Sequence, residues 1–127
     1  MNGSTNDGAP TDHVVFATAE NWVARTAVIA VAGDLDMITA PDLADAIRAA
    51  AAQGPTALIV DLSKVGFLGS AGMSALVGAH QEISGSARFG VVADGPATSR
   101  PLRLLGLDTL LTLYQTLDAA LVDVADA

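Results

Sequence analysis

The chain alternates between two kinds of apolar segment. Short runs rich in β-branched residues predict strands, and segments whose apolar residues recur every three or four positions predict helices. The predicted strands occupy residues 14–19, 26–32, 57–62, 89–93 and 110–114. The run ALIVDL at 57–62 is almost continuously apolar, which is typical of a strand covered on both faces. We expect the first two strands to pair through a turn near Asn21.

A helical segment follows each of the last four predicted strands. The first begins at Thr39, where Asp42 three residues later resembles a capping box, and it stops at Gly54-Pro55. The third is a short helix over residues 98–106. The residues expected to mark the helical faces are Leu43, Ile47, Ala50 and Ala51 in the first helix, Met73, Leu76, Val77, His80 and Ile83 in the second, and Leu117, Ala120, Leu121 and Val124 in the last.

The element order is therefore ββαβαβαβα, which predicts an α/β fold with a mostly parallel mixed sheet and helices packed against it. The first strand is expected to lie antiparallel at an edge. Residues 1–12 are small, polar and turn-rich, so we expect a flexible tail followed by one domain over residues 13–127. Segments that follow parallel strands share one edge of the sheet. The loops expected to be neighbours there are 33–38, 63–71 and 94–99.

Composition removes several classes of function. The chain of 127 residues has a net charge of −8 and one lysine, which argues against binding to nucleic-acid phosphates. It has no cysteine and only 4% aromatic residues, which disfavours thiolate chemistry and stacking surfaces. No apolar run approaches the roughly 18–20 residues that span a bilayer, and there is no secretory signal. We therefore expect a cytoplasmic protein with no nucleic-acid or membrane partner.

The stretch FLGSAGMSAL places Ser70 between a predicted strand and a predicted helix. A nucleophile elbow has the pattern Gly-x-Ser-x-Gly, but Leu68 stands where the first glycine belongs. The two histidines are poorly placed to act as a base, since His13 adjoins the tail and His80 lies about 15 Å further along the same helix. A phosphate-binding loop needs a Gly-Lys pair, which is absent. We expect no catalytic residue and no cofactor.

Two other roles for Ser70 stay open on the residues alone. Its hydroxyl could cap the helix by accepting a hydrogen bond from an amide two or three residues on. It could also receive a phosphate, because a helix N-terminus carries partial positive charge and the neighbouring residues are small. The carboxylates of Asp34 and Asp36 are interpreted as turn formers, so no metal site is expected. Asp61 is expected to accept backbone hydrogen bonds from the loop that follows it.

Residues 61–76, DLSKVGFLGSAGMSAL, resemble the signature of the STAS-domain anti-sigma factor antagonists. In that family an aromatic and an aliphatic residue precede the motif Asp-Ser-Ser/Thr-Gly. The segment VAGDLDMITAPDL is similar to the family's Gly-Glu/Asp-Leu-Asp loop, and LRLLGLDTLLTLYQTLDAAL is similar to its C-terminal pattern. The resemblance covers about residues 14–124, in the family's order, and implies a single STAS-like domain.

This resemblance implies a non-enzymatic switch protein. Unphosphorylated members of the family bind an anti-sigma factor, often a GHKL-type serine kinase, and thereby free a sigma factor for transcription. The kinase phosphorylates the first serine of the motif and weakens binding, and a Ser/Thr phosphatase restores it. The phosphorylation site falls on Ser70. The partner-binding residues fall on Gly33, Asp34, Leu35, Asp36, Gly69, Ser70, Ala71, Gly72 and Met73.

Two positions depart from the family pattern. Gly69 stands where Asp is usual, and Ala71 stands where Ser or Thr is usual. The first change removes a charge beside the acceptor, and the second removes an alternative acceptor, while Ser63 and Ser74 do not align with the modified position. An alternative hypothesis is therefore a STAS-type sensor or scaffold that binds a small anionic ligand or nucleotide without a sigma-related partner.

Overall fold

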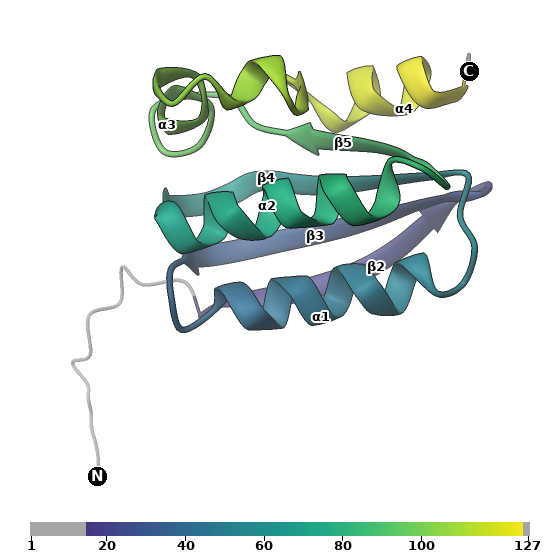
Figure 1. Ribbon diagram of the computed structural model, residues 1–127, viewed down its shortest axis with the longest axis horizontal. Coiled ribbons are helices and arrows are strands. Elements are labelled where there is room, and N and C mark those ends of the chain that lie inside the picture. The colour runs from purple at the N-terminus through teal and green to yellow at the C-terminus, as the bar shows by residue number, and fades with distance from the viewer. Residues whose placement is uncertain (1–14, 126–127) are drawn as a thin grey trace, which may run out of the picture.

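The computed structural model describes residues 15–125, which form a five-stranded sheet with helices packed on it (Figure 1). The strands are β2 (Ala17–Val23), β3 (Thr26–Leu35), β4 (Ala57–Leu68), β5 (Arg88–Val92) and β6 (Thr112–Tyr114). The helices are α1 (Ala40–Ala51), α2 (Ser70–Ile83), α3 (Ser99–Leu104) and α4 (Leu117–Ala125), with a 3₁₀ turn at Leu107–Thr109. The predicted α/β fold and the order ββαβαβαβα are confirmed. The predicted tail at 1–12 and its boundary with the domain lie outside the described residues.

The strands lie in chain order across the sheet, β2-β3-β4-β5-β6. Strand β2 pairs antiparallel with β3, whereas every later neighbouring pair is parallel. The expected edge position and antiparallel direction of the first strand are therefore confirmed. Because each parallel step returns through a helix, the carboxyl ends of β3, β4 and β5 lie at one edge of the sheet. We call this edge the rim.

Two helical layers cover opposite faces of the sheet. On one face, α1 and α2 bury Leu43, Ile47 and Leu76 against alternate residues of the three central strands. On the other face, α4 packs Ala120 against Ile59 of β4 and Val92 of β5. Strand β5 and the first part of β4 are therefore buried on both sides, which explains their continuous apolar runs. Within residues 15–125, no helix has the length and apolarity needed to cross a membrane.

The first hairpin differs from the prediction. Strand β2 continues past Asn21 to Val23, and the turn is the two-residue Ala24-Arg25, where Ala24 has φ +52°. Polar residues do not end this strand because it is an edge strand whose side chains are mostly exposed. The Trp22 indole N–H donates to Glu20 Oε2 at 2.8 Å, which ties two of these side chains together.

Strands β3 and β4 also extend further than predicted. Residues 33–35 and 63–68 belong to strands rather than to loops. The register shifts between Ala30 and Ala32 and again between Gly33 and Asp34, so the irregular residues form bulges within the ladder. Gly33 has φ +96°, a backbone conformation that glycine adopts without a steric cost. The predicted loop residues therefore bend the strands instead of ending them.

A polar cluster joins α4 to the last two strands. The Tyr114 hydroxyl donates to Asp123 Oδ2, and the Arg88 guanidinium pairs with the same carboxylate at 3.0 Å. Gly90 makes room for the Tyr114 ring, since a Cβ at this position would lie 2.7 Å from the ring carbon Cε2. Burial, and then the hydrogen bond to Asp123, raise the pKa of Tyr114 to about 12.

The cluster leads to a pH-dependent prediction. A phenol pKa raised above its unfolded value of 10.0 stabilises the folded state fully below pH 10. This contribution should be lost as the pH rises toward about 12. Tyr114 is the chain's single tyrosine, so tyrosinate absorbance should report its titration directly. Asp123→Asn should move that titration toward lower pH. An unchanged midpoint in this variant would contradict the role assigned to Asp123.

Candidate functional site

The ends of β3 and β4 bring the two predicted site segments together. Asp34 is paired in register with Phe67, and Leu35 with Leu68. Beyond Leu68, the Gly69 N–H donates to the Leu35 carbonyl oxygen at 2.9 Å, which continues the ladder to the first residue before α2. Residues 33–36 and 69–73 therefore meet at the rim, as the sequence predicts.

The start of α2 lies unusually close to β3. A Cβ placed on Gly72 would lie 2.8 Å from Leu68 Cδ1 and 2.9 Å from Leu35 Cβ, so only glycine fits between them. Gly72 and Met73 are buried, as are Gly33 and Leu35. These four residues position the site, and the other members of the predicted partner-binding set are more exposed to solvent. Those are Asp34, Asp36, Gly69, Ser70 and Ala71.

Ser70 is the first residue of α2 and is exposed. The interpretation of Ser70 as the N-cap is wrong, because Gly69 occupies that position with extended backbone and no side-chain cap. The Met73 N–H donates to the Gly69 carbonyl oxygen at 3.0 Å, so the helix starts one residue earlier than a serine cap would require. Among residues 15–125, no hydrogen bond engages the Ser70 hydroxyl. This hydroxyl lies beside the helix's first amides, which lack helical acceptors.

The turn between β3 and α1 is held by Asp36 and Thr39. Asp36 Oδ1 accepts hydrogen bonds from the backbone N–H groups of Ile38 at 2.9 Å and Thr39 at 3.0 Å. Thr39 Oγ1 accepts from the Asp36 N–H and donates to the Asp34 carbonyl oxygen. The predicted capping box with Asp42 does not form, because the Thr39 hydroxyl faces backward into this turn and caps no amide of α1.

These hydrogen bonds fix both the charge and the shape of the turn. The Thr39 backbone N–H is the main cause that lowers the pKa of Asp36, so its carboxylate stays ionised at neutral pH. The same turn exposes Met37 and Ile38, at 80% and 81% of their full surface. The rim therefore presents two large apolar side chains next to fixed negative charge. Between residues 15 and 125, no three acidic or histidine side chains gather as a metal site.

The third predicted loop joins the rim from the side of β5. A cavity of about 550 Å³ lies between the end of β4 and α3. Its lining residues are Gly66, Phe67, Leu68, Pro96, Ala97, Arg100, Pro101 and Leu104. The expected proximity of residues 94–99 to residues 63–71 is thus confirmed. Sequence reasoning missed Phe67 and Leu104 as surface residues, although leucines at positions 102, 104 and 105 cannot all lie on one face of a short helix.

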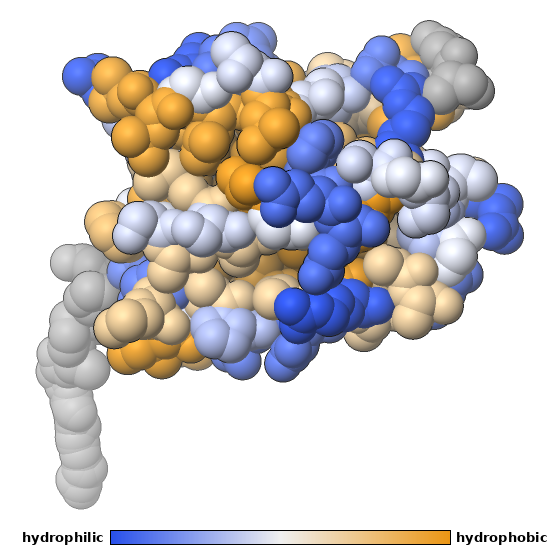
Figure 2. Space-filling view, viewed as in Figure 1, coloured by the Kyte–Doolittle hydropathy of each residue, from blue (hydrophilic) through white to orange (hydrophobic). Residues whose placement is uncertain are grey.

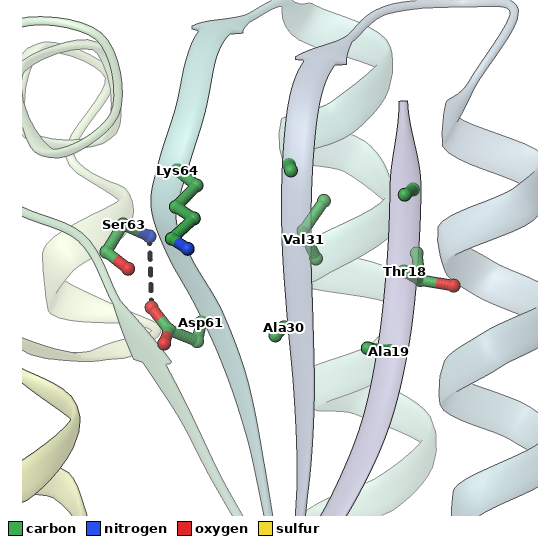
Figure 3. A pocket seen from close by; sticks show the side chains of 9 residues that line it. Thr18, Ala19, Ala30, Val31, Asp61, Ser63 and Lys64 are labelled. Atoms are coloured by element: carbon green, nitrogen blue, oxygen red, sulfur yellow. Dashed lines mark hydrogen bonds between the residues drawn. The ribbon is translucent and has the colours of Figure 1, made fainter. Parts of the chain in front are cut away.

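A second, smaller hollow of about 300 Å³ lies on the sheet face away from α1 and α2 (Figure 3). Alanines of β2 and β3 form its floor, and Asp61, Ser63 and Lys64 of β4 project beside them. Asp61 Oδ1 accepts the Ser63 N–H at 3.0 Å, so the predicted backbone hydrogen bond forms, although Ser63 belongs to β4 and not to a loop. Its β4 residues precede the end of the strand, and none of the predicted partner-binding residues lines the hollow.

Comparison with known proteins identifies similar chains. Residues 18–120 match the STAS domain family. The chain is 44% identical to the anti-sigma-F factor antagonist RsfB of Mycobacterium tuberculosis, over 91% of this chain and 93% of RsfB. An anti-sigma factor antagonist from Mycobacterium paratuberculosis is 45% identical, with a TM-score of 0.83 over 87% of this chain and 94% of its own.

The fold is also similar to that of SpoIIAA. The unphosphorylated form of this anti-sigma factor antagonist is 24% identical, with a TM-score of 0.72 over 87% of this chain and 98% of its own. At that identity, the likeness concerns the fold alone.

The close approach of α2 to β3 leads to a stability prediction with an internal control. Gly72→Ala should destabilise the protein by about 1–3 kcal/mol, because the added methyl group overlaps Leu35 Cβ. Gly78→Ala in the same helix should be neutral or stabilise by up to about 1 kcal/mol, since nothing lies within 4 Å of its Cβ position. Urea unfolding of both variants measures the difference. Equal effects would contradict the packing role of Gly72.

Proposed function

This chain belongs to the STAS domain family, and from that premise we propose that it is an anti-sigma factor antagonist regulated by phosphorylation at Ser70. In this role it binds an anti-sigma factor through the rim and so releases a sigma factor to RNA polymerase. It acts in the cytoplasm by binding, with no reaction of its own. The observation that carries the proposal is an exposed serine at the first position of α2, in a chain 44% identical to an anti-sigma-F factor antagonist.

The geometry of the rim suits a phosphorylation switch. The Ser70 hydroxyl is exposed, so a kinase can reach it without unfolding α2. A phosphate there would add a charge of about −1.5 to −2 at a helix N-terminus that favours anions. The helix can therefore accept the modification. The surface of the partner, which complements the unmodified protein, would face a new negative charge, so binding would weaken. We infer that the anti-sigma factor is a GHKL-type serine kinase and that a Ser/Thr phosphatase reverses the step.

Gly69 and Ala71 change the surroundings of the acceptor without blocking it. The Phe67 ring approaches Gly69 so closely that a Cβ there would lie 3.0 Å from the ring carbon Cε2. An aspartate at position 69 would therefore require this exposed ring to move. In the present chain an aromatic face replaces the carboxylate usual beside the acceptor, and Ala71 leaves Ser70 as the single hydroxyl at the helix start.

Substitutions at Ser70 test the binding surface. Ser70→Glu should weaken binding to the cognate anti-sigma factor at least tenfold, or about 1.4 kcal/mol, because it places a charge inside the contact. Ser70→Ala should bind within about threefold of wild type. Ser74→Glu is the matched control, since Ser74 is exposed one helical turn later. Calorimetric titration measures all three. If only Ser74→Glu lost binding, the partner would contact the region of Ser74 and not that of Ser70.

The acceptor itself is tested by phosphorylation. Incubation with the cognate anti-sigma kinase and Mg-ATP should add one phosphate to the wild type and none to Ser70→Ala, as read by intact and peptide mass spectrometry. Ser63 and Ser74 are also exposed and serve as internal competitors. Modification confined to either of them would overturn the assignment to Ser70, even if the rim still binds the partner.

A further inference from the structure

The Thr39 hydroxyl points away from the helix that it precedes. Thr39 is the N-cap residue of α1, yet within the described residues its Oγ1 caps no amide of this helix. Thr116 shows the usual arrangement in the same chain, because its Oγ1 accepts the Ala119 N–H at 3.1 Å at the start of α4. A threonine before a helix ordinarily stabilises it in this way. The Thr39 side chain therefore serves a structure other than α1.

That structure is the β3–α1 turn. The Thr39 hydroxyl donates to the Asp34 carbonyl oxygen at 2.7 Å and accepts the Asp36 N–H at 2.9 Å. In return, Asp36 Oδ1 accepts the N–H groups of Ile38 and Thr39 at 2.9 and 3.0 Å. The two ends of the turn thus hold each other, and the Thr39 hydroxyl ties the turn back to β3, to which Asp34 belongs.

The turn holds two large apolar side chains in solvent. Met37 and Ile38 are largely exposed, whereas Leu35 before them and Ala40 after them are buried. Figure 2 shows hydrophobic residues at the surface where α1 begins, at the lower left of the view. Apolar groups that gather on one exposed surface mark interaction sites, and methionine is enriched at protein interfaces. The hydrogen bonds of the turn therefore fix the position of groups that the core does not use.

We propose that Thr39 is a positioning residue for partner binding, whose hydroxyl holds the β3–α1 turn in the shape that presents Met37 and Ile38 to the anti-sigma factor. The inference rests on the proposed function, because it assigns how one segment of the rim is prepared for that partner. A turn that already has its bound shape loses little conformational entropy on association. Without the hydroxyl, the turn would become ordered only when the partner binds, and the affinity would fall.

Substitutions at Thr39 test the hydroxyl without changing any charge of the rim. Thr39→Val replaces it with a methyl group and should weaken binding to the cognate anti-sigma factor about tenfold in calorimetric titration. Thr39→Ser keeps the hydroxyl and should bind within about threefold of wild type. Thr56→Val is the matched control, because the Thr56 hydroxyl also contacts a carbonyl oxygen, that of Arg25 at 3.4 Å. Thr56 precedes β4, at the end of the sheet opposite to the rim, so its variant should bind like wild type.

A double-mutant cycle separates positioning from a general structural effect. Met37→Ala combined with Ile38→Ala should weaken binding about tenfold or more, because it removes the presented side chains. Adding Thr39→Val to this pair should then cost less than about twofold, because no apolar side chain is left to present. A substitution that merely loosened the protein would weaken binding equally in both backgrounds.

Measurements on the free protein verify the fold and the turn. Urea unfolding and circular dichroism should show that every variant is folded. Amide hydrogen exchange at Ile38 and Thr39 or its replacement should be faster in Thr39→Val than in wild type and unchanged in Thr39→Ser. Thr39→Ala removes the same hydroxyl and replaces Thr39→Val in the cycle if the valine variant does not fold.

Several outcomes would count against the inference. If Thr39→Val binds like wild type while Ser70→Glu loses binding, Thr39 positions nothing for the partner and the proposed function stands. The inference also fails if Thr39→Ser binds as weakly as Thr39→Val, or if the losses measured in the cycle simply add. If the wild type binds no cognate anti-sigma factor, the proposed function and this inference fail together.

Discussion

The hydrogen bond from the Gly69 amide to the Leu35 carbonyl is the constraint on which the site depends. It extends the pairing of β3 and β4 to the last residue before α2, so the helix begins immediately where the ladder ends. Gly72 then lets the first turn of α2 lie against Leu35 and Leu68. A single backbone contact and the absence of one side chain therefore place Ser70 at the edge of the sheet, beside the β3–α1 turn.

In this arrangement, the residues that support the rim differ from those that form its surface. Buried residues such as Leu35 and Met73 hold the rim in place, and the groups that meet solvent are a hydroxyl, two carboxylates and several large apolar side chains. The Asp36–Thr39 hydrogen bonds keep the β3–α1 turn in one shape. A phosphate on Ser70 could then alter the charge of the surface while the fold beneath it stays unchanged. Under the proposed function, regulation by charge at this site would need no conformational change.

The distribution of charge gives the rim a direction. Carboxylates lie at the β3–α1 turn, whereas the side of α3 carries charges of both signs, and Ser70 follows the strand between the two sides. A phosphate on Ser70 would add negative charge next to the acidic side. In an interface at this rim, the exposed apolar residues would contribute buried contact area, and the charged residues would favour one orientation of the partner.

The sequence alone was sufficient for the class of fold, the order of the elements along the chain and the meeting of the three loops, because apolar periodicity is a local property and crossovers between parallel strands are right-handed. It also singled out Ser70 and the Asp34–Asp36 loop. The sequence could not place the strand ends, because Gly33 and Ser63 are typical of strand breaks, whereas the ladder of β3 and β4 continues past both with shifts in register. It could not decide whether Ser70 or Gly69 caps α2, or that Phe67, Arg100 and Leu104 share a cavity. Those features were decided by tertiary packing, because each depends on which backbone from a distant part of the chain lies alongside.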